Sequence, residues 1–203
     1  MNYLLWVSLG AVAVIGLTVG ITSMMTRKIE TPKYTVLHTI DGIEIRRYPK
    51  MTIARTRVSG PSIDQNGSSG FRSVANYIFG GNERNQKISM TAPVVMDLND
   101  SASLYFVLPS KFALDQLPKP NSSSVQISEL GPTTMAVVRF GGFSTDAKIS
   151  AQCAVVQRFA EEHNLLHKSE FQYMGYNAPW DVVGRRNEVA LTIYSDLEGA
   201  ELK

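Results

Sequence analysis

Apolar and polar side chains alternate along most of the chain beyond residue 34. A period of two places successive side chains on opposite faces of a β-strand, so the alternation predicts strands with one buried and one wet face. The longest run joins Ile88, Met90, Ala92, Val94 and Met96. In all, the pattern predicts eight or nine strands, near residues 36–40, 43–46, 51–58, 88–96, 104–108, 125–127, 135–140, 171–173 and 189–193.

Two segments have the apolar spacing of an α-helix instead. The first is short, near residues 71–79, and the glycines at 80 and 81 favour its end. Its apolar stripe consists of Phe71, Val74, Ala75 and Ile78. The second is longer and covers residues 145–163. Its stripe consists of Ile149, Cys153, Val156 and Ala160.

The order of these elements repeats along the chain. A strand, a helix and a strand near residues 51–94 are matched by a strand, a helix and a strand near residues 135–180. We therefore expect an α+β domain of two pseudo-symmetric halves, in which long antiparallel strands form a distorted β-barrel flanked by the two helices.

The first thirty residues differ from the rest. The 23 residues Tyr3–Met25 carry no charge, which predicts a transmembrane helix and divides the chain into an anchor with its linker, 1–33, and a domain, 34–203. No basic residue precedes the span, so an uncleaved anchor is favoured over a signal peptide. Arg27, Lys28 and Lys33 follow it, and the positive-inside rule places the domain in the cytoplasm. An exported domain on a signal anchor is the alternative.

The composition of the chain excludes several classes of function. The 20 Lys and Arg against 18 Asp and Glu give a net charge of +2, too small for a protein that holds a nucleic acid by its phosphates. The single cysteine, Cys153, excludes a disulfide framework and a cysteine-rich metal site. The chain has no HExxH, nucleophile elbow or phosphate-cradling glycine loop, so a binding protein is favoured over an enzyme.

Five sequence blocks carry a resemblance to a known family. They are Tyr77–Asn82, Lys87–Val94, Phe140–Phe143, Gly175–Trp180 and Arg185–Val189. In this order they closely resemble the SOUL/haem-binding protein family, over roughly residues 34–195. The resemblance implies a monomeric domain, and it implies haem or another tetrapyrrole bound in an apolar surface groove beside the first helix.

Carried over by position, the family's groove is formed by seven residues. They are Phe71, Val74, Ala75 and Ile78 on the helix and Tyr176, Pro179 and Trp180 on a loop. The helical stripe fits a core face equally well. Among possible axial ligands of iron, His38 is a weak candidate, while His163 and His167 fit the end of the second helix better.

These observations favour a membrane-anchored protein that holds haem or another tetrapyrrole reversibly, as a carrier or buffer. Two alternatives stay open. One is an enzyme that acts on a tetrapyrrole or another flat apolar ligand, with Tyr176 or a histidine as acid or base. The other is a small-molecule sensor that passes a binding signal to its anchor.

Overall fold

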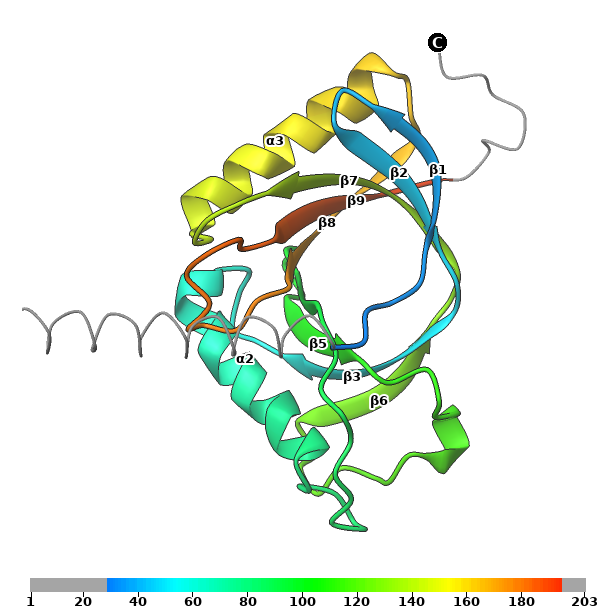
Figure 1. The fold of residues 1–203 in the computed structure, drawn as a ribbon, viewed down its shortest axis with the longest axis vertical. Helices are drawn as coiled ribbons and strands as arrows, with labels where there is room; N and C mark the ends of the chain where they lie inside the picture. The colour runs from blue at the N-terminus through cyan, green and yellow to red at the C-terminus, as the bar shows by residue number, and fades with distance from the viewer. Residues whose placement is uncertain (1–28, 195–203) are drawn as a thin grey trace, which may run out of the picture.

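The computed structural model describes residues 29–194, and its core is one sheet of nine antiparallel strands with two helices on one face (Figure 1). The predicted span, 3–25, lies outside these residues. Within 29–194 no helix has the length and apolar character needed to cross a bilayer. The elements are β1 (Thr35–Ile40), β2 (Ile43–Tyr48), β3 (Met51–Arg57), α2 (Ile63–Ile78), β4 (Val94–Asp97), β5 (Ser103–Val107), the short 3-10 helix η1 (Leu114–Gln116), β6 (Val125–Leu130), β7 (Thr133–Phe140), α3 (Asp146–Glu162), β8 (His167–Gly175) and β9 (Asn187–Ile193).

The sheet consists of two matching halves, as the repeated element order predicts. Its strand order is β1-β2-β7-β9-β8-β4-β5-β3-β6. The units β3-α2-β4-β5 and β7-α3-β8-β9 follow the same sequence of elements, and β4 and β8 pair at the centre where the halves join. The α+β class, the antiparallel sheet and the two main helices are thus confirmed.

The predicted barrel is wrong in one respect, because the sheet that the described residues form is open. β1 pairs with β2 alone and β6 with β3 alone, so these two strands are its edges. The sheet curls around its inner face, the one without helices (Figure 1). Large side chains such as Tyr105 and Met135 are buried on that face.

The predicted strand over 88–96 is shorter than expected. Only Val94–Asp97 pairs as β4. The Ala92-Pro93 peptide bond before it is cis, and proline has no N–H for a ladder hydrogen bond. Ile88 donates its N–H to the carbonyl of Ile78 instead, and its buried side chain joins the core under α2.

The two helices begin side by side and cap each other. The carboxylate of Asp146, in the first turn of α3, accepts hydrogen bonds from the Ile63 N–H at 2.8 Å and the Ser62 hydroxyl at 2.5 Å. In return, the carboxylate of Asp64 in α2 accepts from the Asp146 N–H at 3.2 Å. Each helix therefore satisfies part of the other's free N-terminal N–H groups, which fixes how the halves meet.

Three apolar clusters form the core. The outer face of the sheet, which carries the helices, packs against α3 in one half and α2 in the other. The inner face has a cluster of its own. It contains Tyr48, Ile53, Val95, Tyr105, Val107, Met135, Val137, Met174 and Ala190. Successive side chains of the same strands thus pack into two buried layers, one on each face of the sheet. For this reason few of these strands have the solvent-exposed face that the pattern predicts.

Candidate functional site

The stripe predicted along the first helix lies against the sheet. Val74, Ala75 and Ile78 are buried in the cluster beneath α2. Phe71 is half-buried, and its ring packs on Phe106 of β5 with centroids 5.3 Å apart. In this structure the stripe is a core face, and contact between these residues and a ligand stays a prediction.

The three predicted loop residues differ in their surroundings. Tyr176, half-buried, packs on the inner-face cluster, whereas α2 covers the outer face. Pro179 and Trp180 are exposed at the tip of the loop that joins β8 to β9. The structure therefore does not bring Tyr176 and the α2 stripe together on one surface.

A buried charged cluster lies on the inner face next to Tyr176. Glu188 of β9 is fully buried and accepts hydrogen bonds from two guanidinium groups. Arg46 binds it through Nη1 and Nη2, at 2.8 and 3.1 Å, and Arg186 through Nε and Nη2, at 2.9 and 2.7 Å. The Tyr176 hydroxyl donates to the same carboxylate at 2.9 Å. The fork of Arg46 spans both carboxylate oxygens, that of Arg186 binds Oε1 alone, and together they compensate the burial of the charge.

Tyrosine rings line the same cluster. The guanidinium of Arg46 lies 4.4 Å from the centroid of Tyr34, and that of Arg186 lies 3.9 Å from the centroid of Tyr176. Burial raises the pKa of Tyr176 above its ordinary value, and the carboxylate of Glu188 adds to the shift. The phenol of Tyr176 is therefore neutral near pH 7, as an ordinary tyrosine also is.

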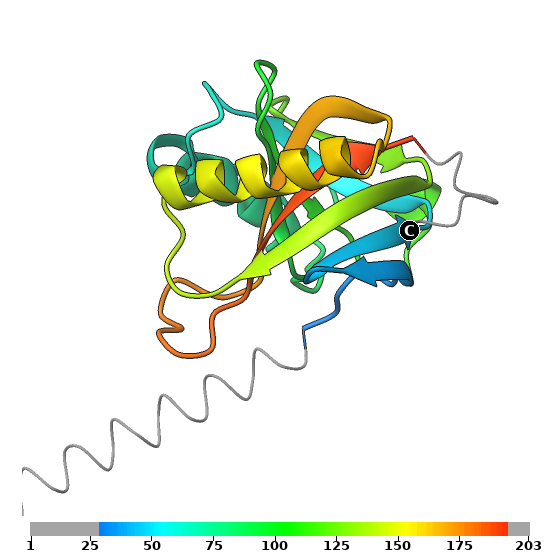
Figure 2. The ribbon, with the colours of Figure 1, turned by 90° about the horizontal axis from the view of Figure 1, so that it is seen from above.

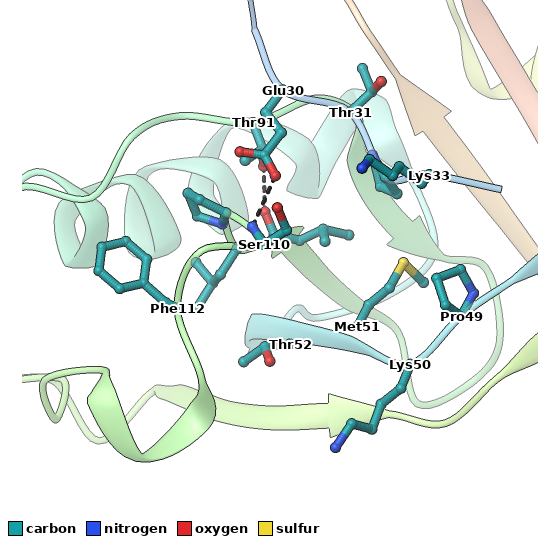
Figure 3. Close-up of a pocket in the computed structure, with 14 residues that line it drawn as sticks. Glu30, Thr31, Lys33, Pro49, Lys50, Met51, Thr52, Thr91, Ser110 and Phe112 are labelled. Atoms are coloured by element: carbon teal, nitrogen blue, oxygen red, sulfur yellow. Dashed lines mark hydrogen bonds between the residues drawn. The ribbon is translucent and has the colours of Figure 1, made fainter.

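Residues 30–33, where the described part of the chain begins, cover a pocket next to Pro49 and Met51 (Figure 3). Glu30 holds this segment in place: its carbonyl accepts from the Ala92 N–H at 2.9 Å, and its carboxylate accepts from the Ser110 N–H at 2.9 Å. Beneath this segment is a cavity of about 370 Å³. Its apolar lining is made by Pro32, Pro49, Met51, Val107, Leu108, Pro109 and Phe112.

Two lysines stand at this pocket. Lys50 makes an ion pair with Glu129 at 2.9 Å, whereas Lys33 is exposed and has no ion-pair partner among residues 29–194. An apolar cavity with a cation at its rim suits an apolar molecule that carries a carboxylate, and its volume lies within the roughly 300–1,000 Å³ of small-molecule sites. The sequence did not indicate this pocket, because residues 29–33 look like a linker and only their pairing with the domain makes them a wall.

The three histidines are far from a metal-binding arrangement. Nδ1 of His163, the C-cap of α3, lies 2.9 Å from the Phe159 carbonyl, and Nδ1 of His167 lies 3.1 Å from the Lys168 carbonyl. His38 is half-buried in β1. Across the described part of the chain, no three His, Cys, Asp or Glu side chains gather as a metal site would require. Burial raises the pKa of Cys153 to about 11, which keeps it a thiol.

Comparison with known proteins identifies relatives of this chain by sequence. The family profile described as SOUL heme-binding protein matches residues 29–192. The mouse (Mus musculus) protein named Heme-binding protein 2 is 30% identical over 80% of this chain and 85% of its own length. The human (Homo sapiens) protein of that name is 32% identical over 73% and 76%. Heme-binding protein 1 of Xenopus laevis is 26% identical over 73% and 83%.

Solved structures share the fold at much lower identity. The C-terminal domain of EcmrR superposes with a TM-score of 0.57 at 9% identity, covering 79% of this chain and 98% of that one. A hydrolase from Listeria innocua superposes with a TM-score of 0.56 at 9% identity, covering 78% and 94%. At these identities the likeness is one of fold alone.

Proposed function

The chain belongs to the SOUL haem-binding protein family, and from this membership we propose that it holds haem, or another tetrapyrrole, reversibly and without changing it. The observation that carries the proposal is the match of the family profile to residues 29–192, which is nearly the whole of the described domain. A carrier or buffer needs only a site that binds and releases, so no catalytic group is required.

The pocket beneath residues 30–33 supports this proposal by its chemistry. A tetrapyrrole such as haem is a flat apolar disc with carboxylate groups at one edge. The prolines, Met51 and Phe112 provide apolar contact, and Lys33, which has no ion-pair partner within residues 29–194, offers its ammonium to a carboxylate. The face of α2 fits such a ligand less well, because Val74 and Ile78 would first have to leave the core.

Titration of the full chain in detergent micelles with haemin tests the function. We expect a saturable shift of the Soret band and recovery of unchanged haemin on extraction. Metal-free protoporphyrin, titrated in parallel, shows whether iron is needed. Absence of saturable binding to either compound would refute the proposal, and catalytic turnover of the ligand would replace the carrier with an enzyme.

Histidine variants are expected to bind haem almost as well as the wild type. The changes His38→Ala, His163→Ala and His167→Ala should each weaken haem affinity by less than about tenfold, or about 1.4 kcal/mol, because apolar contact dominates and two of the rings already face backbone carbonyls. The Soret titration of each variant measures this. Loss of the Soret shift in one variant would identify an axial iron ligand.

The predicted span at 3–25 supports a second part of the proposal, that the domain is tethered to a membrane. The basic residues after the span favour the cytoplasmic side. The span serves location rather than folding, so a chain that begins at Ile29 should be soluble and should unfold cooperatively in urea, because the strands bury their apolar faces on each other and on the helices. Aggregation of this shorter chain, or a broad transition, would show that the domain needs the span.

A further inference from the structure

The loop between β8 and β9 exposes three large apolar side chains at its tip. Trp180, Val182 and Val183 have 67%, 57% and 71% of their surface in contact with water. Single exposed apolar residues are ordinary, but a soluble domain rarely gathers several on one projecting turn without a partner for them. The loop projects from the domain rather than lying across it (Figure 2).

Hydrogen bonds hold this loop in its shape. The buried carboxylate of Asp181 accepts from the Ala178 N–H at 3.2 Å and from the Asn177 side chain at 3.3 Å. The guanidinium of Arg185 closes the loop by donating to the carbonyls of Ala178 and Asp181, at 3.1 and 2.7 Å. The apolar tip is therefore presented by a braced turn, and folding it back onto the domain would break these bonds.

The loop lies on the same side of the domain as residues 29–33, where the described part of the chain begins. In Figure 2, residues 29–33 and the loop both extend from the lower side of the domain, while α3 and the turn between α3 and β8 lie at the upper side. Two hydrogen bonds fix Glu30 to the domain, from the N–H groups of Ala92 and Ser110. The point where the chain enters the domain is thus a fixed part of that surface.

The sequence leaves little distance between this point and the predicted span. Five residue steps separate Met25, where the span ends, from Glu30. A fully extended chain covers at most about 3.6 Å per residue, so Glu30 lies within about 18 Å of the end of the span. A domain held so closely has to turn the side that carries Glu30, and with it the loop, toward the bilayer.

We propose that the tip of the β8–β9 loop inserts Trp180, Val182 and Val183 into the interfacial layer of the membrane that holds the span. This rests on the tether in the proposed function. Indole rings favour the boundary between headgroups and acyl chains, and valines favour its apolar side. A loop contact beside the span would hold the domain in one orientation on the membrane.

The full chain offers a direct probe, because Trp6 and Trp180 are its two tryptophans. The variant Trp6→Phe leaves Trp180 as the reporter. It is reconstituted, without haem, into vesicles of phosphatidylcholine and phosphatidylserine, and brominated acyl chains or aqueous iodide quench its fluorescence. We expect blue-shifted emission, strong quenching by brominated lipid and protection from iodide.

A matched control carries its tryptophan on the far side. In the variant Trp6→Phe/Trp180→Phe/Leu166→Trp, the reporter replaces a leucine of similar exposure, 68%, in the turn between α3 and β8. Its emission should be quenched by iodide and unaffected by brominated lipid. Identical behaviour of the two reporters would overturn the loop contact. Failure of the chain to float with the vesicles would overturn the tether as well, while haem titration of the same chain reports on ligand binding separately.

Discussion

Replacing Val74 by aspartate is expected to lower the melting temperature of the domain by more than about 10 °C, or to prevent its accumulation. Val74 is fully buried between α2 and the outer face of the sheet, where Leu104 and Phe106 belong to the same cluster. A carboxyl group placed there loses its water and gains no partner, at a cost of several kcal/mol out of the roughly 5–15 kcal/mol that stabilise a domain. For a domain of this size each kcal/mol corresponds to about 2–4 °C.

Asn76→Asp is the matched control for this change. Asn76 lies two residues further along α2, on its exposed side, so the control adds the same charge to the same helix without burying it. Its melting temperature should stay within about 3 °C of the wild type, since exposed substitutions have small effects. If Val74→Asp instead kept its melting temperature and lost haem binding, the α2 stripe would line a groove in solution, as the family resemblance implies.

Sequence reasoning predicted the two-half fold because each half repeats one strand-helix-strand order, and local periodicity encodes that order. It misplaced the start of α2, which begins at Ile63 rather than near Phe71. Glycines at 67 and 70 lower helix propensity and hide the first turns. Gly70 has a packing reason to be there: a Cβ at this position would lie 3.0 Å from Cβ of Leu104, so glycine lets the helix approach the sheet.

The candidate site was harder to predict from the sequence than the fold. A helical stripe has the same spacing whether it meets a sheet or a ligand, so the pattern at 71–78 fits both. The block Arg185–Glu188 is a compact charged group in the sequence, and in the structure the guanidinium of Arg186, in the loop, binds the carboxylate of Glu188 on β9 at 2.7 Å. Arg46 also binds Glu188. In the sequence it alternates with Ile43 and Ile45, so the pattern predicts that it faces water. The sheet order β2-β7-β9 brings it to Glu188 across 142 residues of sequence.

Replacing Glu188 by glutamine is expected to lower the free energy of unfolding by about 3–5 kcal/mol at pH 7, the usual effect of breaking a buried ion pair. Glutamine keeps the shape of the side chain but provides one acceptor oxygen instead of two. Arg46, with 3% of its side chain exposed, would lose the carboxylate that offsets its charge. Urea unfolding of the chain that begins at Ile29, if it folds as predicted, measures the change.

The control for this variant is Glu44→Gln. Glu44 makes the other ion pair of Arg46, at 2.7 Å, but its side chain is 35% exposed. Ion pairs with a partner in water contribute about 1 kcal/mol or less. If Glu44→Gln lowered the free energy of unfolding as much as Glu188→Gln does, any change around Arg46 would be equally destabilising. The burial of Glu188 would then not be the reason for the strength of its ion pair.

The pH dependence of the free energy of unfolding distinguishes the contribution of the Glu188 charge from that of the side chain's shape. Burial alone would raise the pKa of its carboxyl, but hydrogen bonds and charge from Arg46, with the charge of Arg186, hold the pKa below its ordinary value of 4.5. A carboxyl with a lowered folded-state pKa contributes its full stability above its unfolded pKa and loses it as the pH falls toward the folded one. Glutamine does not titrate, so the stability difference between wild type and Glu188→Gln should be greatest near pH 7 and shrink below about pH 4.5. A difference that stays constant down to about pH 3 would mean that the lost oxygen geometry, rather than the lost charge, destabilises the variant.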